Sequence, residues 1–96
     1  MIAFREVLRK TARSLGIEPA MHLSTVESRW SQVVGPALAG ATAPRSLRGG
    51  TLVVIAAHPL AAQEVRLRSE GIVAALQREV PQAGLRRIRV LVRGRA

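Results

Sequence analysis

Residues 41–57 read ATAPRSLRGGTLVVIAA, and they carry the clearest β-hairpin pattern in the chain. The glycine pair at 49–50 accepts the positive φ angles of a tight turn, and the run at 52–55 is rich in β-branched residues. Pro44 cannot donate a ladder hydrogen bond, so the first strand is short, begins after Pro44, or lies at a sheet edge. The stretch therefore predicts two antiparallel strands.

Helical patterns precede this hairpin. Apolar residues recur at the spacing of one helix face over residues 4–15, and Arg and Lys occupy the opposite face. Ser24 and Glu27 have the spacing of a capping box, which predicts the start of a second helix. Gly35 and Pro36 predict its end, because glycine allows a left-handed exit and proline forbids continuation.

A helix and a strand follow the hairpin. His58 and Pro59 predict the start of the longest helix, with proline at a position where its missing N–H costs nothing. The apolar face of this helix continues to Val80, after which Pro81 ends it. Residues 87–93 alternate between arginine or leucine and β-branched residues, which predicts a strand with one buried face.

The order helix, helix, strand, strand, helix, strand predicts an α+β fold in which helices cover one face of a three-stranded sheet. We expect a single domain over residues 1–96, because a chain of this length forms one hydrophobic core. The sequence has no cysteine and no apolar run of about 18 residues, which predicts a soluble cytoplasmic protein without a membrane partner.

The net charge is the most informative bulk property. Fifteen basic residues against six acidic ones give +9, and such a surplus attracts polyanions, of which nucleic acid is the commonest. The predicted phosphate-binding residues are Arg45, Arg48, Arg87, Arg89 and Arg93. If the hairpin and the last strand share a sheet, these guanidinium groups form one groove wall that grips phosphates without reading base sequence. With one Trp, one Phe and no Tyr, a base-stacking platform is not expected.

Catalytic and metal-binding patterns are not found in the sequence. His22 and His58 are the only histidines, and neither is followed by a second ligand three or four residues later. No nucleophile elbow and no glycine-rich phosphate loop occurs, so we expect no enzyme, no metal, no cofactor and no small-molecule substrate. Trp30 has two interpretations, as a core residue or as an exposed anchor for a protein partner.

A longer set of residues carries a family resemblance. In chain order these are Trp30, Val33-Val34-Gly35, Ala39, Thr42, Pro44, Leu47, Gly50-Thr51-Leu52-Val53-Val54, Leu60-Ala61-Ala62 and Glu64. The order resembles the bacterial DciA family of replicative helicase loaders, and the similarity covers residues 3–92. The resemblance implies a KH-like fold, a cytoplasmic location, binding of single-stranded or tailed DNA, help in loading the replicative helicase, and a functional role for Trp30.

Two classes of function therefore stay open. The first is a nucleic-acid-binding adaptor that assists replicative helicase loading, with RNA as an alternative ligand to DNA. The second is a protein-interaction domain whose basic face docks onto an acidic partner and never touches nucleic acid.

Overall fold

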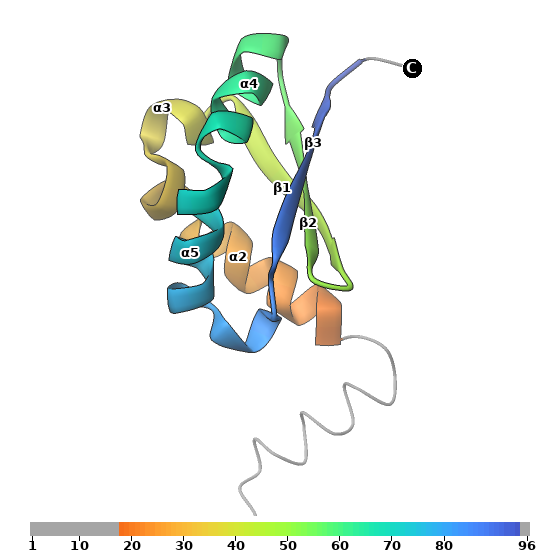
Figure 1. Ribbon diagram of the computed structural model, residues 1–96. Coiled ribbons are helices and arrows are strands. Elements are labelled where there is room, and N and C mark those ends of the chain that lie inside the picture. Colours follow the sequence, from red (N-terminus) through yellow and green to blue (C-terminus); the bar gives the residue numbers. More distant parts are fainter. Residues whose placement is uncertain (1–17, 95–96) are drawn as a thin grey trace, which may run out of the picture.

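The computed structural model describes residues 18–94, which form a three-stranded sheet with helices packed against one face (Figure 1). The elements are α2 (Glu18–Val34), α3 (Pro36–Ala39), β1 (Thr42–Arg48), β2 (Thr51–Ala56), α4 (Pro59–Leu67), α5 (Ser69–Glu79), the 3-10 helix η1 (Pro81–Ala83) and β3 (Arg87–Val92). The predicted α+β class and the helix-covered sheet are confirmed. The predicted helix over residues 4–15 lies outside the described residues.

The sheet is mixed. Its strand order is β1-β2-β3, with β1 antiparallel to β2 and β3 parallel to β2. The hairpin turn lies at Gly49 and Gly50, whose φ angles of 56° and 80° are those that glycine adopts readily. Pro44 lies in β1, which is an edge strand, so the third of the three expectations for this proline is the correct one.

A β-bulge interrupts the β1–β2 ladder. Pro44 pairs with Val54 and Ser46 with Val53, so Arg45 is the extra residue of β1. A bulge re-aims the side chains that follow it and increases the local twist of the strand. This bulge changes which face of the sheet the arginines of β1 occupy.

One hydrophobic core lies between the helices and the sheet. The largest of its fully buried side chains are Val26, Leu52, Val54, Val65, Leu76, Val80 and Leu85. These residues come from α2, β2, α4, α5 and the segments that flank η1. The sheet and the helices therefore depend on one another for burial of their apolar faces.

Trp30 belongs to this core. Its side chain is 4% exposed, and its indole Nε1 donates a hydrogen bond of 3.0 Å to Thr42 Oγ1. The Thr42 hydroxyl in turn donates to the carbonyl oxygen of Leu38 over 2.8 Å. A buried indole N–H needs such a partner, and this one connects α2, α3 and the start of β1.

Two predicted helix boundaries are confirmed. His58 precedes α4, its Nδ1 accepts a hydrogen bond from the amide of Ala61 over 3.1 Å, and Pro59 follows at the first helical position. At the end of α2, Gly35 has a φ of 90°, and Pro36 begins the short α3. Both boundaries rest on local backbone chemistry that the sequence displays directly.

The predicted capping box is wrong. Helix α2 begins at Glu18, so Ser24 lies inside it rather than at its start. Pro19 sits in the first turn, where a missing N–H costs nothing and the fixed φ favours the helix. The half-buried Leu23 also extends the apolar face of α2 toward its N-terminus, which keeps this segment helical.

The predicted long helix is in fact two helices. A break at Arg68, whose φ and ψ are −101° and 9°, separates α4 from α5. Arg68 Nη1 donates to the carbonyl oxygen of Val34 over 3.2 Å, so the break coincides with a cap on the last residue of α2. As a result α2, with 17 residues, is the longest described helix.

Replacing Trp30 with Phe tests the buried hydrogen bond. We expect Trp30→Phe to lower the free energy of unfolding by about 2 kcal/mol, because it removes a donor and leaves a small cavity. Arg29→Ala, at an exposed position of the same helix, is the control and should change this free energy by less than about 0.5 kcal/mol. Urea denaturation followed by circular dichroism measures both, and equal stability of the two variants would contradict the assignment.

Two glycine substitutions should have opposite effects on the free energy of unfolding. At Gly50 a Cβ would lie 2.7 Å from Arg86 Nε and 3.1 Å from the Gly84 carbonyl oxygen, and φ is +80°. Gly50→Ala should therefore lower the free energy of unfolding by about 1–3 kcal/mol. Gly71 lies in α5, and a Cβ added there would meet no atom within 4 Å apart from its chain neighbours and the adjacent backbone of its own helix. Gly71→Ala should raise stability by about 0.5–1 kcal/mol, as thermal denaturation can show.

Candidate nucleic-acid interface

The sheet buries only one of its faces. Along β2, Leu52, Val54 and Ala56 are buried toward the helices. The alternate residues, Thr51, Val53 and Ile55, are half-buried and point to the opposite face, on which no described helix lies (Figure 1). We call this second surface the open sheet face.

The strand register places predicted arginines in rows across the open sheet face. Thr51 is the β2 partner of both Arg48 on β1 and Arg87 on β3, so these two arginines flank it from the outer strands. Val53 is flanked in the same way by Ser46 and Arg89. Neighbouring strands lie about 4.8 Å apart, so the backbones of β1 and β3 are separated by about 10 Å.

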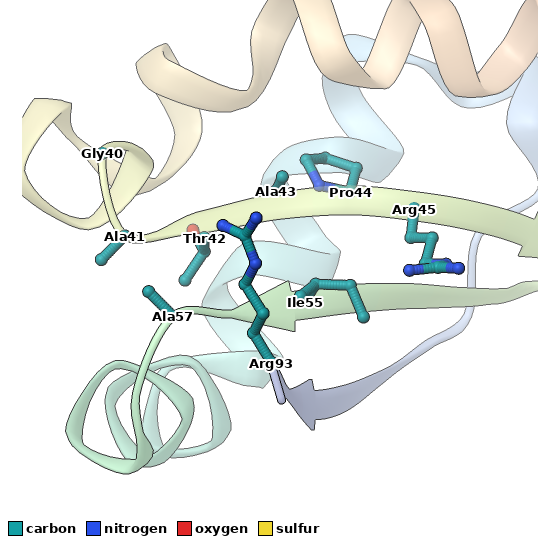
Figure 2. A pocket seen from close by; sticks show the side chains of 9 residues that line it. All are labelled: Gly40, Ala41, Thr42, Ala43, Pro44, Arg45, Ile55, Ala57 and Arg93. Carbon is teal, nitrogen blue, oxygen red and sulfur yellow. The ribbon is translucent and has the colours of Figure 1, made fainter. Parts of the chain in front are cut away.

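Arg45 and Arg93 complete the set at the other end of this face. Both line a hollow of about 530 Å³ at the start of β1, with Ile55 between them (Figure 2). Arg45 reaches the hollow because it is the bulge residue of β1. Arg93 follows the last residue of β3, and its amide still donates to the Ala56 carbonyl oxygen over 2.7 Å.

The structure thus brings all of the predicted phosphate-binding residues to one surface. These open-face arginines are Arg45, Arg48, Arg87, Arg89 and Arg93, and each is exposed. Among the described residues, hydrogen bonds engage the guanidinium groups of Arg66, Arg68 and Arg86, whereas the open-face arginines make none. Their charges are therefore available to an external anion.

The acidic residues of the described chain lie outside the strands, and one of them, Glu70, lines a hollow together with Arg87. The strands β1, β2 and β3 contain no Asp or Glu. The glutamates of residues 18–94 are Glu18, Glu27, Glu64, Glu70 and Glu79, and all lie in helices. Within residues 18–94 no acidic side chain forms an ion pair with the open-face arginines, so this face carries positive charge that concentrates anions near it.

Arg86 has a structural role close to this face. Its backbone amide donates to the Gly50 carbonyl oxygen over 2.7 Å, and its Nη2 donates to the Gly49 carbonyl oxygen over 3.3 Å. The amide of Arg87 donates to the same Gly50 oxygen over 3.0 Å. These bonds tie the start of β3 to the hairpin turn and so fix the register of the arginine rows.

Trp30 does not contribute to the open sheet face, because it is buried on the helix side. The core interpretation of this residue is the one that the structure shows, and its role toward a protein partner stays a prediction. Its hydrogen bond to Thr42 joins α2 to β1. The face has instead an apolar strip that the sequence did not identify as part of the site, formed by Val53, Ile55 and Leu91, of which Leu91 is 41% exposed.

Two further observations limit the chemistry of the described part of the chain. Residues 18–94 contain no cluster of three or more side chains of the kind that holds a metal ion. No helix in the same range is long and apolar enough to cross a membrane.

The fold and the surface together define a class: a small α+β domain with one helix-covered sheet face and one basic, open sheet face. Within that class the chain belongs to the DciA family, since residues 3–90 match the family described as Dna[CI] antecedent, DciA. This is a bacterial family of replicative helicase loaders, which places the chain among the adaptors of DNA replication. No curated protein matches the chain.

If the open-face arginines serve a ligand, they should contribute little to folding. We expect Arg48→Ala and Arg89→Ala each to change the free energy of unfolding by less than about 0.5 kcal/mol. Arg68→Ala is the contrasting variant and should lower it by about 1 kcal/mol, because it removes the hydrogen bond to Val34. Urea denaturation of the three variants is the measurement, and a larger loss for Arg48 or Arg89 than for Arg68 would show a structural role.

Proposed function

We propose that this protein is a non-enzymatic adaptor that binds DNA on its open sheet face and assists loading of the replicative helicase. One observation carries the proposal. Exposed arginines without a hydrogen-bond partner come from both outer strands to one surface, and the strands of that surface contain no Asp or Glu. Membership of a helicase-loader family supplies the second half of the proposal.

The arrangement suits one nucleic-acid strand lying along β2. Guanidinium groups approach it from both sides, from Arg48 on β1 and from Arg87 and Arg89 on β3. Each can hold a phosphate through two parallel hydrogen bonds. The apolar strip of Val53 and Ile55 between them can contact sugars and base edges but cannot stack on bases as an aromatic side chain would.

Binding of this kind does not discriminate between base sequences. Phosphate contacts fix position and affinity, whereas base contacts give sequence specificity. A loader that acts at replication forks needs affinity for exposed single strands of any sequence, and a surface of arginines and aliphatic side chains provides that. RNA offers the same phosphates, so a direct comparison of DNA and RNA oligonucleotides belongs to the test.

The salt dependence of binding to a labelled single-stranded oligonucleotide tests the DNA-binding half. Each phosphate contact on a single strand contributes about −0.7 to the slope of log affinity against log salt, so four or five arginines predict a slope near about −3. Arg45→Ser/Arg48→Ser should reduce the magnitude of this slope by about 1.4. Fluorescence anisotropy at several salt concentrations measures both slopes.

A charge-matched variant separates the open sheet face from the overall charge. Arg29→Ser/Arg78→Ser removes the same number of charges from exposed positions on α2 and α5. It should leave the salt slope close to that of the unmodified protein. An equal loss in both double variants would show diffuse attraction, and absence of binding at low salt would favour the alternative in which the arginines dock onto an acidic protein surface.

A further inference from the structure

The outer edge of β3 is a free edge in the described part of the chain, because β3 pairs only with β2. In a strand, successive residues direct their N–H and C=O groups to opposite sides. The amides of Arg87 and Arg93 donate toward the hairpin and β2, to the carbonyl oxygens of Gly50 and Ala56. The backbone groups of the alternate residues Ile88, Val90 and Val92 therefore point outward from the sheet.

A groove runs beside this edge. A hollow of about 310 Å³ lies between β3 and α5, and we call it the edge groove. Its walls are Ser69, Glu70, Val73, Ala74 and Gln77 on the helix side and Arg86, Arg87 and Ile88 on the strand side. Val73 and Ile88 are half-buried, so the groove has an apolar base next to outward-pointing backbone groups. An extended peptide between an edge strand and a helix uses this combination of features.

The two edges of the sheet are protected to different degrees. β1 has Pro44, which cannot donate, and the bulge at Arg45, and both features obstruct the addition of another strand. β3 has neither, since Arg87–Val92 contains no proline and pairs with β2 in unbroken register. One outward carbonyl of this edge has a side-chain partner: Arg66 Nη2 donates a hydrogen bond of 3.4 Å to the carbonyl oxygen of Val90.

We propose that the free edge of β3 binds an extended segment of a partner protein, in which acidic and apolar residues alternate, as a fourth strand of the sheet. On the open sheet face such a strand would place side chains beside Arg87 and Arg89, where carboxylates are favoured. On the opposite face its side chains enter the edge groove beside Val73 and Ile88, where apolar groups are favoured. The charge pattern of β3 thus specifies the partner's pattern.

A second copy of this chain is a poor occupant of the same edge. In antiparallel self-pairing centred on Val90, Arg87 would stand directly opposite Arg93. A shift of the register in one direction puts Arg89 opposite Arg89, and a shift in the other puts Arg89 opposite Arg93. Like charges directly opposite one another destabilise a strand pair, so an acidic peptide is the better partner.

The proposal goes beyond DNA binding and does not depend on it. The probe is a fluorescein-labelled peptide in which glutamate and valine alternate. It is designed with about seven residues, which is roughly the length of a strand of this size. Two further peptides have N-methyl groups on all the valine amides or on all the glutamate amides. Only one of these sets of amides can face β3, so one N-methylated peptide should bind about tenfold more weakly or worse, and the other should bind like the unmodified peptide.

This comparison holds peptide charge constant, so it separates strand addition from simple attraction to a basic protein. The identity of the weakened peptide also gives the strand direction. Loss on valine methylation indicates antiparallel addition, and loss on glutamate methylation indicates parallel addition. Equal affinity of the two methylated peptides would overturn the proposal.

Protein variants locate the site. Ala74→Trp fills the edge groove at an exposed position of α5 and should weaken binding of the unmodified peptide by about tenfold. Ala37→Trp, at an exposed position of α3 outside the edge groove, is the matched control and should have no effect. Arg45→Ser/Arg48→Ser, which alters the opposite edge, should lower DNA affinity and leave peptide affinity unchanged.

Amide hydrogen exchange followed by NMR provides a second readout. Peptide binding should slow the exchange of the Ile88 and Val90 amides, which point outward from the free edge, whereas DNA on the open sheet face should not. If DNA protects these amides, and if Ala74→Trp weakens DNA binding as much as peptide binding, the edge groove is a nucleic-acid site and the peptide proposal is wrong. Failure of the DNA test alone would leave the peptide result intact.

Discussion

One buried hydroxyl group links the sheet to the two helices that precede it. Thr42 Oγ1 accepts a hydrogen bond from the Trp30 indole and donates one to the Leu38 carbonyl oxygen, so a single polar atom fixes α2, α3 and the first residue of β1. Thr42 is the one buried polar residue of the described chain. Leaving the Trp30 indole N–H or the Thr42 hydroxyl without a hydrogen-bond partner in an apolar core costs free energy of folding. The geometry of α2, α3 and β1 is therefore interdependent.

The second constraint is the connection between β3 and the hairpin turn. The Gly50 carbonyl oxygen accepts from the amides of Arg86 and Arg87, and a side chain at Gly50 would collide with its neighbours. This fixes Arg87 opposite Thr51. Since the side-chain period of a strand is two, a slip of one residue would turn the arginines of β3 into the core, and the register is therefore essential to the charged surface.

Local signals were sufficient for much of this architecture. The glycine pair of the hairpin, the His58–Pro59 helix start and the alternation of β3 each follow from the chemistry of adjacent residues, and the structure has all of them. The break at Arg68 could not be predicted from local signals, because the buried residues Val65 and Ile72 keep a helical spacing across it. The break coincides with a hydrogen bond from Arg68 to Val34, which is distant in sequence.

On the open sheet face, too, some positions follow from the local sequence and others depend on pairing between strands. On β3, Arg87 and Arg89 are two residues apart, so their common face follows from the strand period alone. On β1, Arg45 and Arg48 are three apart, and strict alternation would place them on opposite faces. The bulge at Arg45 shifts the phase and brings both to the open face, and its position depends on the pairing of Pro44 with Val54 rather than on a motif.

Arg87 and Arg89 are common to the two proposed surfaces, and this has a thermodynamic consequence. A DNA strand lying along β2 and an acidic strand added to β3 would both use these guanidinium groups, so each ligand reduces the charge available to the other. Coupling between two binding sites is reciprocal, so an acidic partner segment that binds the edge would weaken DNA binding by the same factor as DNA weakens binding of the segment. An adaptor that must deliver a strand to another protein needs such a release step, and shared arginines would supply it without a change of fold.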